Sequence, residues 1–189
     1  MMLEGNYIRL EPLSLDHLDA LCEVGLDEAI WQWSPLPIRS RNDMRAYVEA
    51  AIAGRKQGHM LPFATVERAT GRVAGSTRFG AIDAANRRLE IGWTWIAPPW
   101  QRTAVNTEAK LLMLAHAFEV LSCHRVEFKT DRLNERSRNA VLRLGAKEEG
   151  TLRKHMVTAS GRLRDSVYFS ILDDEWPAVK AHLQRKLPR

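Results

Sequence analysis

Cysteine is scarce in this sequence, and its two residues, Cys22 and Cys123, belong to no CxxC pair. A disulfide framework or a zinc knuckle needs more cysteines at closer spacing, so neither is indicated, and both thiols suit a reducing cytoplasm. The six histidines form no spacing such as HxxxH. We therefore expect no metal site.

Long apolar runs are absent as well. The first eleven residues include Glu4, Arg9 and Glu11 and lack the apolar core of an export signal, and no run approaches a membrane span. We expect a cytoplasmic protein with no membrane partner. Repeats and Ser/Gly-rich linkers are missing too, and 189 residues, 45% of them hydrophobic, suit a single domain over residues 1–189.

The formal net charge is +5, which suits phosphate-bearing or acidic partners and equally an ordinary solvated surface. Nucleic acid is not an expected partner, because glutamates interleave with the arginines of residues 127–149 and no aromatic stacking platform is evident. A homodimer is expected only from the general frequency of symmetric dimers.

Hydrophobic periodicity predicts an α+β domain. Helices are expected after the caps Ser14 and Ser40, over residues 105–121 and 135–144, and from about Asp174. Strands are expected at residues 7–10, 63–67, 72–79, 89–95, 125–131, 151–158 and 163–172. In the strand at 89–95, alternation assigns Trp93 and Trp95 to the core.

The turn at residues 101–107 links the clearest strand to the clearest helix. Backbone N–H groups in the first turn of a helix have no internal partner, and the helix dipole favours negative charge. Arg102 adds positive charge, Thr103 and Thr107 add hydroxyls, and Asn106 can cap the helix or bond a phosphate oxygen. The segment predicts either a capped helix start or an anion site.

Three separated segments support the second interpretation. They are Leu89-Glu90-Ile91-Gly92-Trp93, the turn from Gln101 to Asn106 followed by Thr107-Glu108-Ala109, and Asn134-Glu135-Arg136-Ser137 with Leu144-Gly145-Ala146. Together they make nearly the whole chain resemble the GCN5-related N-acetyltransferase (GNAT) superfamily, in its branch of RimJ- and RimL-type ribosomal-protein N-terminal acetyltransferases. The resemblance implies a mixed, mostly antiparallel, twisted sheet of about seven strands with helices on both faces and splayed strands 4 and 5.

The resemblance also implies an activity, the transfer of an acetyl group from acetyl-CoA to a primary amine by direct attack in a ternary complex. The amine would belong to a protein N-terminus or to a small molecule. In the family, a Gln/Arg-x-x-Gly-x-Gly/Ala turn binds the cofactor pyrophosphate, which implies contacts from Gln101, Arg102, Thr103, Ala104, Val105, Asn106 and Thr107. Ala104 and Asn106 depart from the family's small residues, and Ala104 would be strained if its φ were positive. A non-catalytic acyl-CoA-binding module is the alternative.

Further contacts follow from the same resemblance. Trp95 and Ile96 would pair through their backbones with the pantetheine arm, and Asn134 and Ser137 would contact the cofactor. The helix at 135–144 lacks the tyrosine that protonates the departing thiolate in many relatives, so Ser137 is the candidate acid.

A base is useful, because an amine attacks a thioester only when it is neutral. The resemblance implies that Glu90, on the strand face opposite Leu89 and Ile91, is this base and takes the proton through ordered water. The alternative is a surface glutamate paired with Arg87 or Arg88.

The acceptor groove of the family lies between the first two helices and the last two strands. This implies that Trp31, Trp33 and His155 contact the acceptor. Alternatively, the tryptophans only bury the helical pair.

Overall fold

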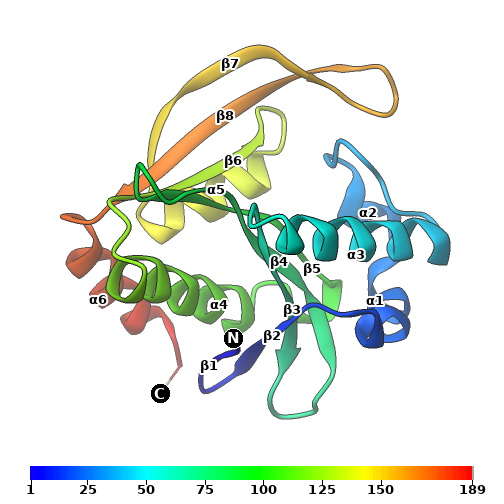
Figure 1. Ribbon diagram of the computed structural model, residues 1–189, viewed down its shortest axis with the longest axis horizontal. Coiled ribbons are helices and arrows are strands. Elements are labelled where there is room, and N and C mark those ends of the chain that lie inside the picture. The colour runs from blue at the N-terminus through cyan, green and yellow to red at the C-terminus, as the bar shows by residue number, and fades with distance from the viewer. Residues whose placement is uncertain (189) are drawn as a thin grey trace.

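The computed structural model describes residues 1–188 and shows one sheet of eight strands in the order β1-β2-β3-β4-β5-β6-β8-β7 (Figure 1). All neighbouring strands pair antiparallel except β5 and β6, which are parallel. The strands are β1 (Leu3–Glu4), β2 (Ile8–Pro12), β3 (Leu61–Glu67), β4 (Val73–Asp83), β5 (Arg88–Ile96), β6 (Arg125–Asp131), β7 (Lys147–Val157) and β8 (Leu163–Leu172). The mixed, mostly antiparallel sheet is confirmed, and the strand beyond the expected seven is the two-residue β1.

The helices lie close to their predicted positions, apart from the four-residue α2, which the sequence did not predict. They are α1 (Leu18–Gly25), α2 (Glu28–Trp31), α3 (Arg41–Lys56), α4 (Ala104–Ala115), α5 (Glu135–Leu144) and α6 (Trp176–Lys186). Ser40 caps α3 by accepting the Asp43 N–H, and Gly145 ends α5 in a left-handed conformation with φ +103. A π-helical turn at His116–Val120 follows α4, where the sequence predicts continuous α-helix. No helix of residues 1–188 is both long and apolar enough to cross a bilayer.

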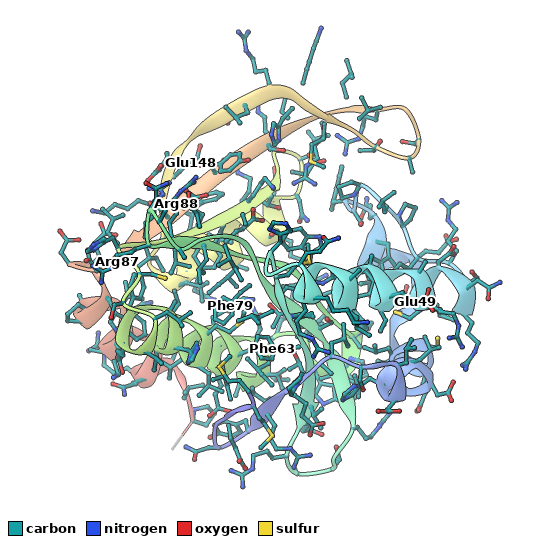
Figure 2. The ribbon with its side chains drawn as sticks, in the orientation of Figure 1. Glu49, Phe63, Phe79, Arg87, Arg88 and Glu148 are labelled. Carbon is teal, nitrogen blue, oxygen red and sulfur yellow. The ribbon has the colours of Figure 1, made fainter. Side chains whose placement is uncertain are left out.

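Helices cover both faces of the sheet at β4. The Thr77 hydroxyl lies 3.6 Å from the Met113 sulfur of α4, whereas the neighbouring Arg78 guanidinium lies 4.1 Å from the Tyr47 ring of α3. Successive side chains of a strand point to opposite faces, so α3 and α4 lie on opposite sides. Phe63 and Phe79, labelled in Figure 2, are buried and meet edge to face with ring centres 5.9 Å apart.

A bulge interrupts β5. Gly92 pairs with Arg78 and Trp95 with Ser76, so two residues, Trp93 and Thr94, stand opposite Thr77 alone. Trp93 takes a φ of +50 and is 41% exposed, whereas Trp95 is 6% exposed. The prediction that Trp93 lies in the core is therefore wrong, because a bulge inserts one residue and reverses the alternation beyond it.

Candidate active site

The central feature is a wedge between β5 and β6. These strands pair at only three positions, the last of which joins Glu90 to Glu127. β5 then continues to Ile96 and β6 to Asp131 with no pairing between them in the described chain. The two strands therefore splay as expected, and their facing backbone groups are available to an extended ligand. One carbonyl in the wedge is already engaged, since Gln101 Nε2 donates to the Ile96 oxygen at 2.7 Å.

A short 3-10 helix at Pro98–Trp100 follows β5, and the 101–107 turn then opens α4. Thr103, rather than Asn106, is the N-cap, and its hydroxyl accepts the Val105 N–H at 3.3 Å. The left-handed residue of the turn is Arg102, with φ +62, while Ala104 is the first helical residue. The strain considered for Ala104 therefore does not arise.

Polar groups suited to a phosphate-bearing ligand gather at this turn. The Asn106 Oδ1 atom is buried and has no hydrogen-bond partner among residues 1–188. The amide can rotate and present its NH2 group instead, so an anion here can receive a hydrogen bond. Gln101 Oε1 accepts a hydrogen bond from the Arg136 guanidinium of α5, which adds a second cation beside Arg102.

Glu90 lies at the apex of the wedge and is only 5% exposed. Its Oε2 atom lies 3.2 Å from Lys129 Nζ. Burial raises the pKa of Glu90 above the ordinary 4.5, and the Lys129 ammonium opposes that rise. Gly92 leaves room for the carboxylate, because a Cβ there would lie 2.6 Å from Glu90 Oε1.

The arginines considered as partners of Glu90 bind elsewhere. Arg88 pairs with Asp83 and Glu127, and Arg87 donates to the Ser122 carbonyl. Figure 2 labels both arginines, which lie near the start of β5. The alternative of a surface glutamate is therefore wrong.

The N-terminus of α5 follows β6, the second strand of the wedge. Asn134 caps α5, and its Oδ1 accepts the Ser137 N–H at 3.0 Å. Ser137 is half-buried in the first turn. The hydrogen bond between Gln101 and Arg136 joins this helix end to the 101–107 turn.

The two tryptophans predicted at the acceptor groove occupy different environments. Trp31 is 6% exposed, its ring centre lies 5.4 Å from that of Trp95, and its Nε1 donates to the Gly25 carbonyl. Trp33 instead lies beneath the Arg162 guanidinium, whose Cζ atom is 5.7 Å from the centre of the Trp33 ring. Trp31 thus packs in the core, and Trp33 faces the β7–β8 hairpin.

The β7–β8 hairpin arches toward the loop after α2 (Figure 1). At its tip the Ala159 N–H donates to the Pro35 carbonyl at 2.9 Å. His155 lies on this hairpin, with Nδ1 3.0 Å from the Ser166 hydroxyl and its ring edge-on to Tyr168. The structure therefore brings the hairpin together with the loop between α2 and α3 (residues 32–40, the Trp33 loop) over one side of the sheet.

A buried lysine of α4 was missed by sequence reasoning. Lys110 is 4% exposed, and its Nζ donates to the hydroxyls of Thr77 and Thr94 at 3.0 and 2.6 Å. Burial lowers the pKa of Lys110 to about 7. The available signal was its position three and four residues before Met113 and Leu114, on the apolar stripe of the helix.

Two further cations were missed, Lys129 of β6 and Arg164 of β8. Both belong to the polar side of an alternating strand, and the β6–β8 register places Lys129 opposite Tyr168 on the same face. Alternation in each strand could have indicated a polar face, but not which strands share it. Among residues 1–188 no three His, Cys, Asp or Glu side chains gather so as to hold a metal ion.

Comparisons with known proteins agree with this geometry. Residues 8–147 match the family model described as an acetyltransferase (GNAT) domain. A crystal structure of a GCN5-related N-acetyltransferase from Brucella melitensis has a TM-score of 0.90 and 37% identity, covering 98% of this chain and 84% of that chain. The protein named ribosomal N-acetyltransferase YdaF, from Bacillus subtilis (strain 168), is 34% identical over 110 residues, 58% of this chain and 59% of that protein. Mycobacterium smegmatis RimJ in complex with CoA-disulfide shares the fold, with a TM-score of 0.81, 23% identity, and coverage of 95% of this chain and 88% of that chain.

Proposed function

Because this chain belongs to the GNAT acetyltransferase family, we propose that it transfers an acetyl group from acetyl-CoA to a primary amine. The observation that carries the proposal is the β5–β6 wedge with a capped helix N-terminus beside it. The name of the relative YdaF supports the RimJ/RimL-type branch and makes a protein N-terminus one acceptor to test. The proposal includes a cytoplasmic location and no metal ion.

In this proposal the cofactor is held from both sides of the wedge. The backbone of Trp95 and Ile96 pairs with the pantetheine arm, and the amides at residues 101–107 bind the pyrophosphate with help from Arg102 and Asn106. Asn134 and Ser137 contact the cofactor from α5. The orphaned Asn106 amide and the helical Ala104 support this assignment, since the turn can accept phosphate without backbone strain.

The chain supplies the acid–base groups of the reaction. Glu90 accepts the proton of the attacking amine, and its raised pKa makes it a stronger base than an exposed glutamate. Lys129 favours the ionised carboxylate that this step needs. As the bond from nitrogen to the acetyl carbon forms and the carbon–sulfur bond breaks, the hydroxyl of Ser137, the candidate acid, donates a hydrogen bond to the departing thiolate. The proton that Glu90 takes from the amine passes to solvent, and the thiolate gains one from solvent, so the step balances. Acetyl-CoA itself supplies an activated thioester.

Calorimetric titration with acetyl-CoA, CoA and NADPH tests cofactor binding, with NADPH as the phosphate-bearing control. Selective binding of the two CoA ligands is the expected result, and its failure would contradict the proposal. A screen of amines for thiol release then tests turnover. Tight binding without release for any amine would favour the non-catalytic acyl-CoA-binding module.

A further inference from the structure

A polar face of the sheet runs from Glu90 across β6 to β8. Glu90 pairs in register with Glu127, whose face also carries Lys129 and Asp131 of β6. Lys129 lies opposite Tyr168, and Asp131 opposite Ser166, so the even-numbered residues of β8 share this face. It is the α3 side of the sheet, because Glu90 is in register with Gly80, two residues after Arg78.

Arg164 lies on the same face, two residues before Ser166, and is 6% exposed. Its Nε is buried and has no hydrogen-bond partner among residues 1–188. The closest carboxylate oxygen, Asp131 Oδ2, is 3.9 Å away, beyond a hydrogen bond. Asp131 is already engaged, because it accepts hydrogen bonds from the Leu133 N–H and from Arg162.

Glu127 on this face pairs with Arg88 and Arg125, and the charges toward the β8 side do not cancel. Lys129 balances Glu90, while Arg162 and Arg164 together face the single carboxylate of Asp131. A buried charge without a full set of hydrogen bonds is costly in a folded protein. At the β8 side of the face, Arg164 therefore remains for a partner of opposite charge.

Arg164 and Glu90 belong to one electrostatic site. Burial lowers the pKa of Arg164 while Asp131 and Glu90 raise it, and Arg164 in turn lowers the pKa of Glu90. The Trp33 loop and the hairpin tip meet over this side of the sheet, at Arg162 and at the contact between Pro35 and Ala159. Glu90 and the Arg164 guanidinium, whose Nε lacks a hydrogen-bond partner among residues 1–188, therefore lie on one partly covered face.

We infer that Arg164 binds a carboxylate of the acceptor, so that the preferred substrates are amines that also carry a carboxylate. This inference rests on the proposed acetyl transfer, in which Glu90 receives the amine proton. A guanidinium binds a carboxylate through paired, charge-assisted hydrogen bonds, which also orient the ligand. The carboxylate comes either from a free amino acid or from an acidic side chain next to a peptide N-terminus.

Matched probes test the inference in the full-length protein by calorimetry, with and without CoA. Leucine against leucinamide isolates an α-carboxylate, and the amidated tripeptides Met-Glu-Leu and Met-Gln-Leu isolate a side-chain carboxylate. In at least one pair the carboxylate member should bind about tenfold tighter or more, as expected of a charge-assisted pair. Equal affinities within both pairs, or no binding by either carboxylate probe, would overturn the inference. The wild-type comparison needs no variant.

Substitution of Arg164 assigns the effect to this residue. Arg164→Gln should abolish the preference for the carboxylate member of the probe pair, whereas Arg164→Lys should retain part of that preference. Both variants should keep their affinity for CoA. Their urea midpoints should stay near that of wild type, because Asp131 keeps its hydrogen bonds from Arg162 and from the Leu133 N–H. A preference that survives in Arg164→Gln would remove Arg164 from the site.

The same measurements separate this inference from the proposed function. If the protein binds no CoA, the acetyl transfer fails while the carboxylate preference is still measured directly. If it binds CoA and acetylates neutral and anionic amines equally, only the inference fails.

Discussion

At the scale of single residues, the buried ionisable side chains differ in how fully they are paired. Glu90, Glu108, Lys110 and Arg164 are exposed by 5%, 3%, 4% and 6%. Glu108 accepts three backbone N–H groups, whereas Lys110 reaches only two hydroxyls and Arg164 has a distant carboxylate. Because burying a charge is costly unless it is paired, the well-paired Glu108 suits a structural role, and the less fully paired Arg164 suits a functional one.

Replacing the candidate base tests its role directly. Glu90→Gln should lower kcat/KM at pH 7 by about 100-fold or more, because proton transfer by a positioned base contributes that much. In the wild type the acidic limb of the pH–rate profile should lie above pH 4.5, since burial raises the pKa of Glu90. The variant should lose this limb and shift its optimum upward, where more of the amine is neutral.

The control for Glu90 is Glu148→Gln, a substitution of an exposed glutamate on β7, which should leave the profile unchanged. Full activity of Glu90→Gln at neutral pH would remove Glu90 from the mechanism.

The buried Lys110 should make stability depend on pH. Its folded pKa of about 7 lies below the ordinary 10.5, so between these values the unfolded chain binds a proton that the folded chain does not. The free energy of unfolding should therefore rise with pH in this window, by up to about 1.4 kcal/mol per pH unit. Lys110→Met should flatten that rise in urea titrations at pH 7, 8 and 9. Parallel slopes for the two proteins would show that Lys110 titrates normally.

At the scale of elements, α4 connects several parts of the protein. Its first turn forms the candidate phosphate site, Glu108 holds the chain between β1 and β2, and Lys110 lies against the bulge of β5. Glu108 fits closely, because a Cβ on Gly5 would lie 2.4 Å from its carboxyl carbon. A substitution in the first two turns of this helix therefore affects either ligand binding or folding, depending on the residue that is changed.

The Glu108 clamp should contribute strongly to stability. Glu108→Ala leaves the N–H groups of Asn6, Tyr7 and Ile8 without their acceptor, and we expect a loss of about 2–5 kcal/mol in the free energy of unfolding. Urea denaturation measures it. The matched control is Glu49→Ala on the exposed face of α3, labelled in Figure 2, which should cost less than about 0.5 kcal/mol. Similar losses in both variants would mean that the clamp is not specific.

The first turn of α4 should control cofactor affinity. Asn106→Leu removes the amide and adds apolar bulk, so the Kd for CoA should rise severalfold, while Asn106→Gly, which removes the amide but adds no bulk, should weaken binding less. Calorimetry with CoA compares the three proteins. Unchanged affinity in Asn106→Leu would remove this turn from the binding site.

Local signals explain which parts of the fold were predictable. Ser40 and Gly145 mark helix ends through contacts within a few residues, so the sequence suffices to place them. The bulge at Trp93 and the partner of Glu90 depend instead on neighbouring strands. Lys129 lies 39 positions beyond Glu90 in the chain, and only the parallel pairing of β5 with β6 brings the two together. The family motifs indicated the cofactor turn, but no motif indicated Arg164.

At the scale of the whole molecule, the sheet consists of two parts joined by three residue pairs. Strands β1–β5 form one part and β6, β8 and β7 the other. The β7–β8 hairpin spans the gap on one side through its contact with Pro35. Segments from the first quarter and the last quarter of the chain thus meet over the candidate acceptor face, which neither could form alone.

So narrow a junction between β5 and β6 links the two parts of the sheet only weakly. Amides along the free edges of the wedge lack strand partners, so the two parts of the sheet can fluctuate as separate cooperative units with their own hydrogen-exchange rates. A ligand chain that pairs with both edges would couple those units and slow exchange in both at once. A ligand bound in the wedge would then be detected as slower hydrogen exchange across the entire sheet.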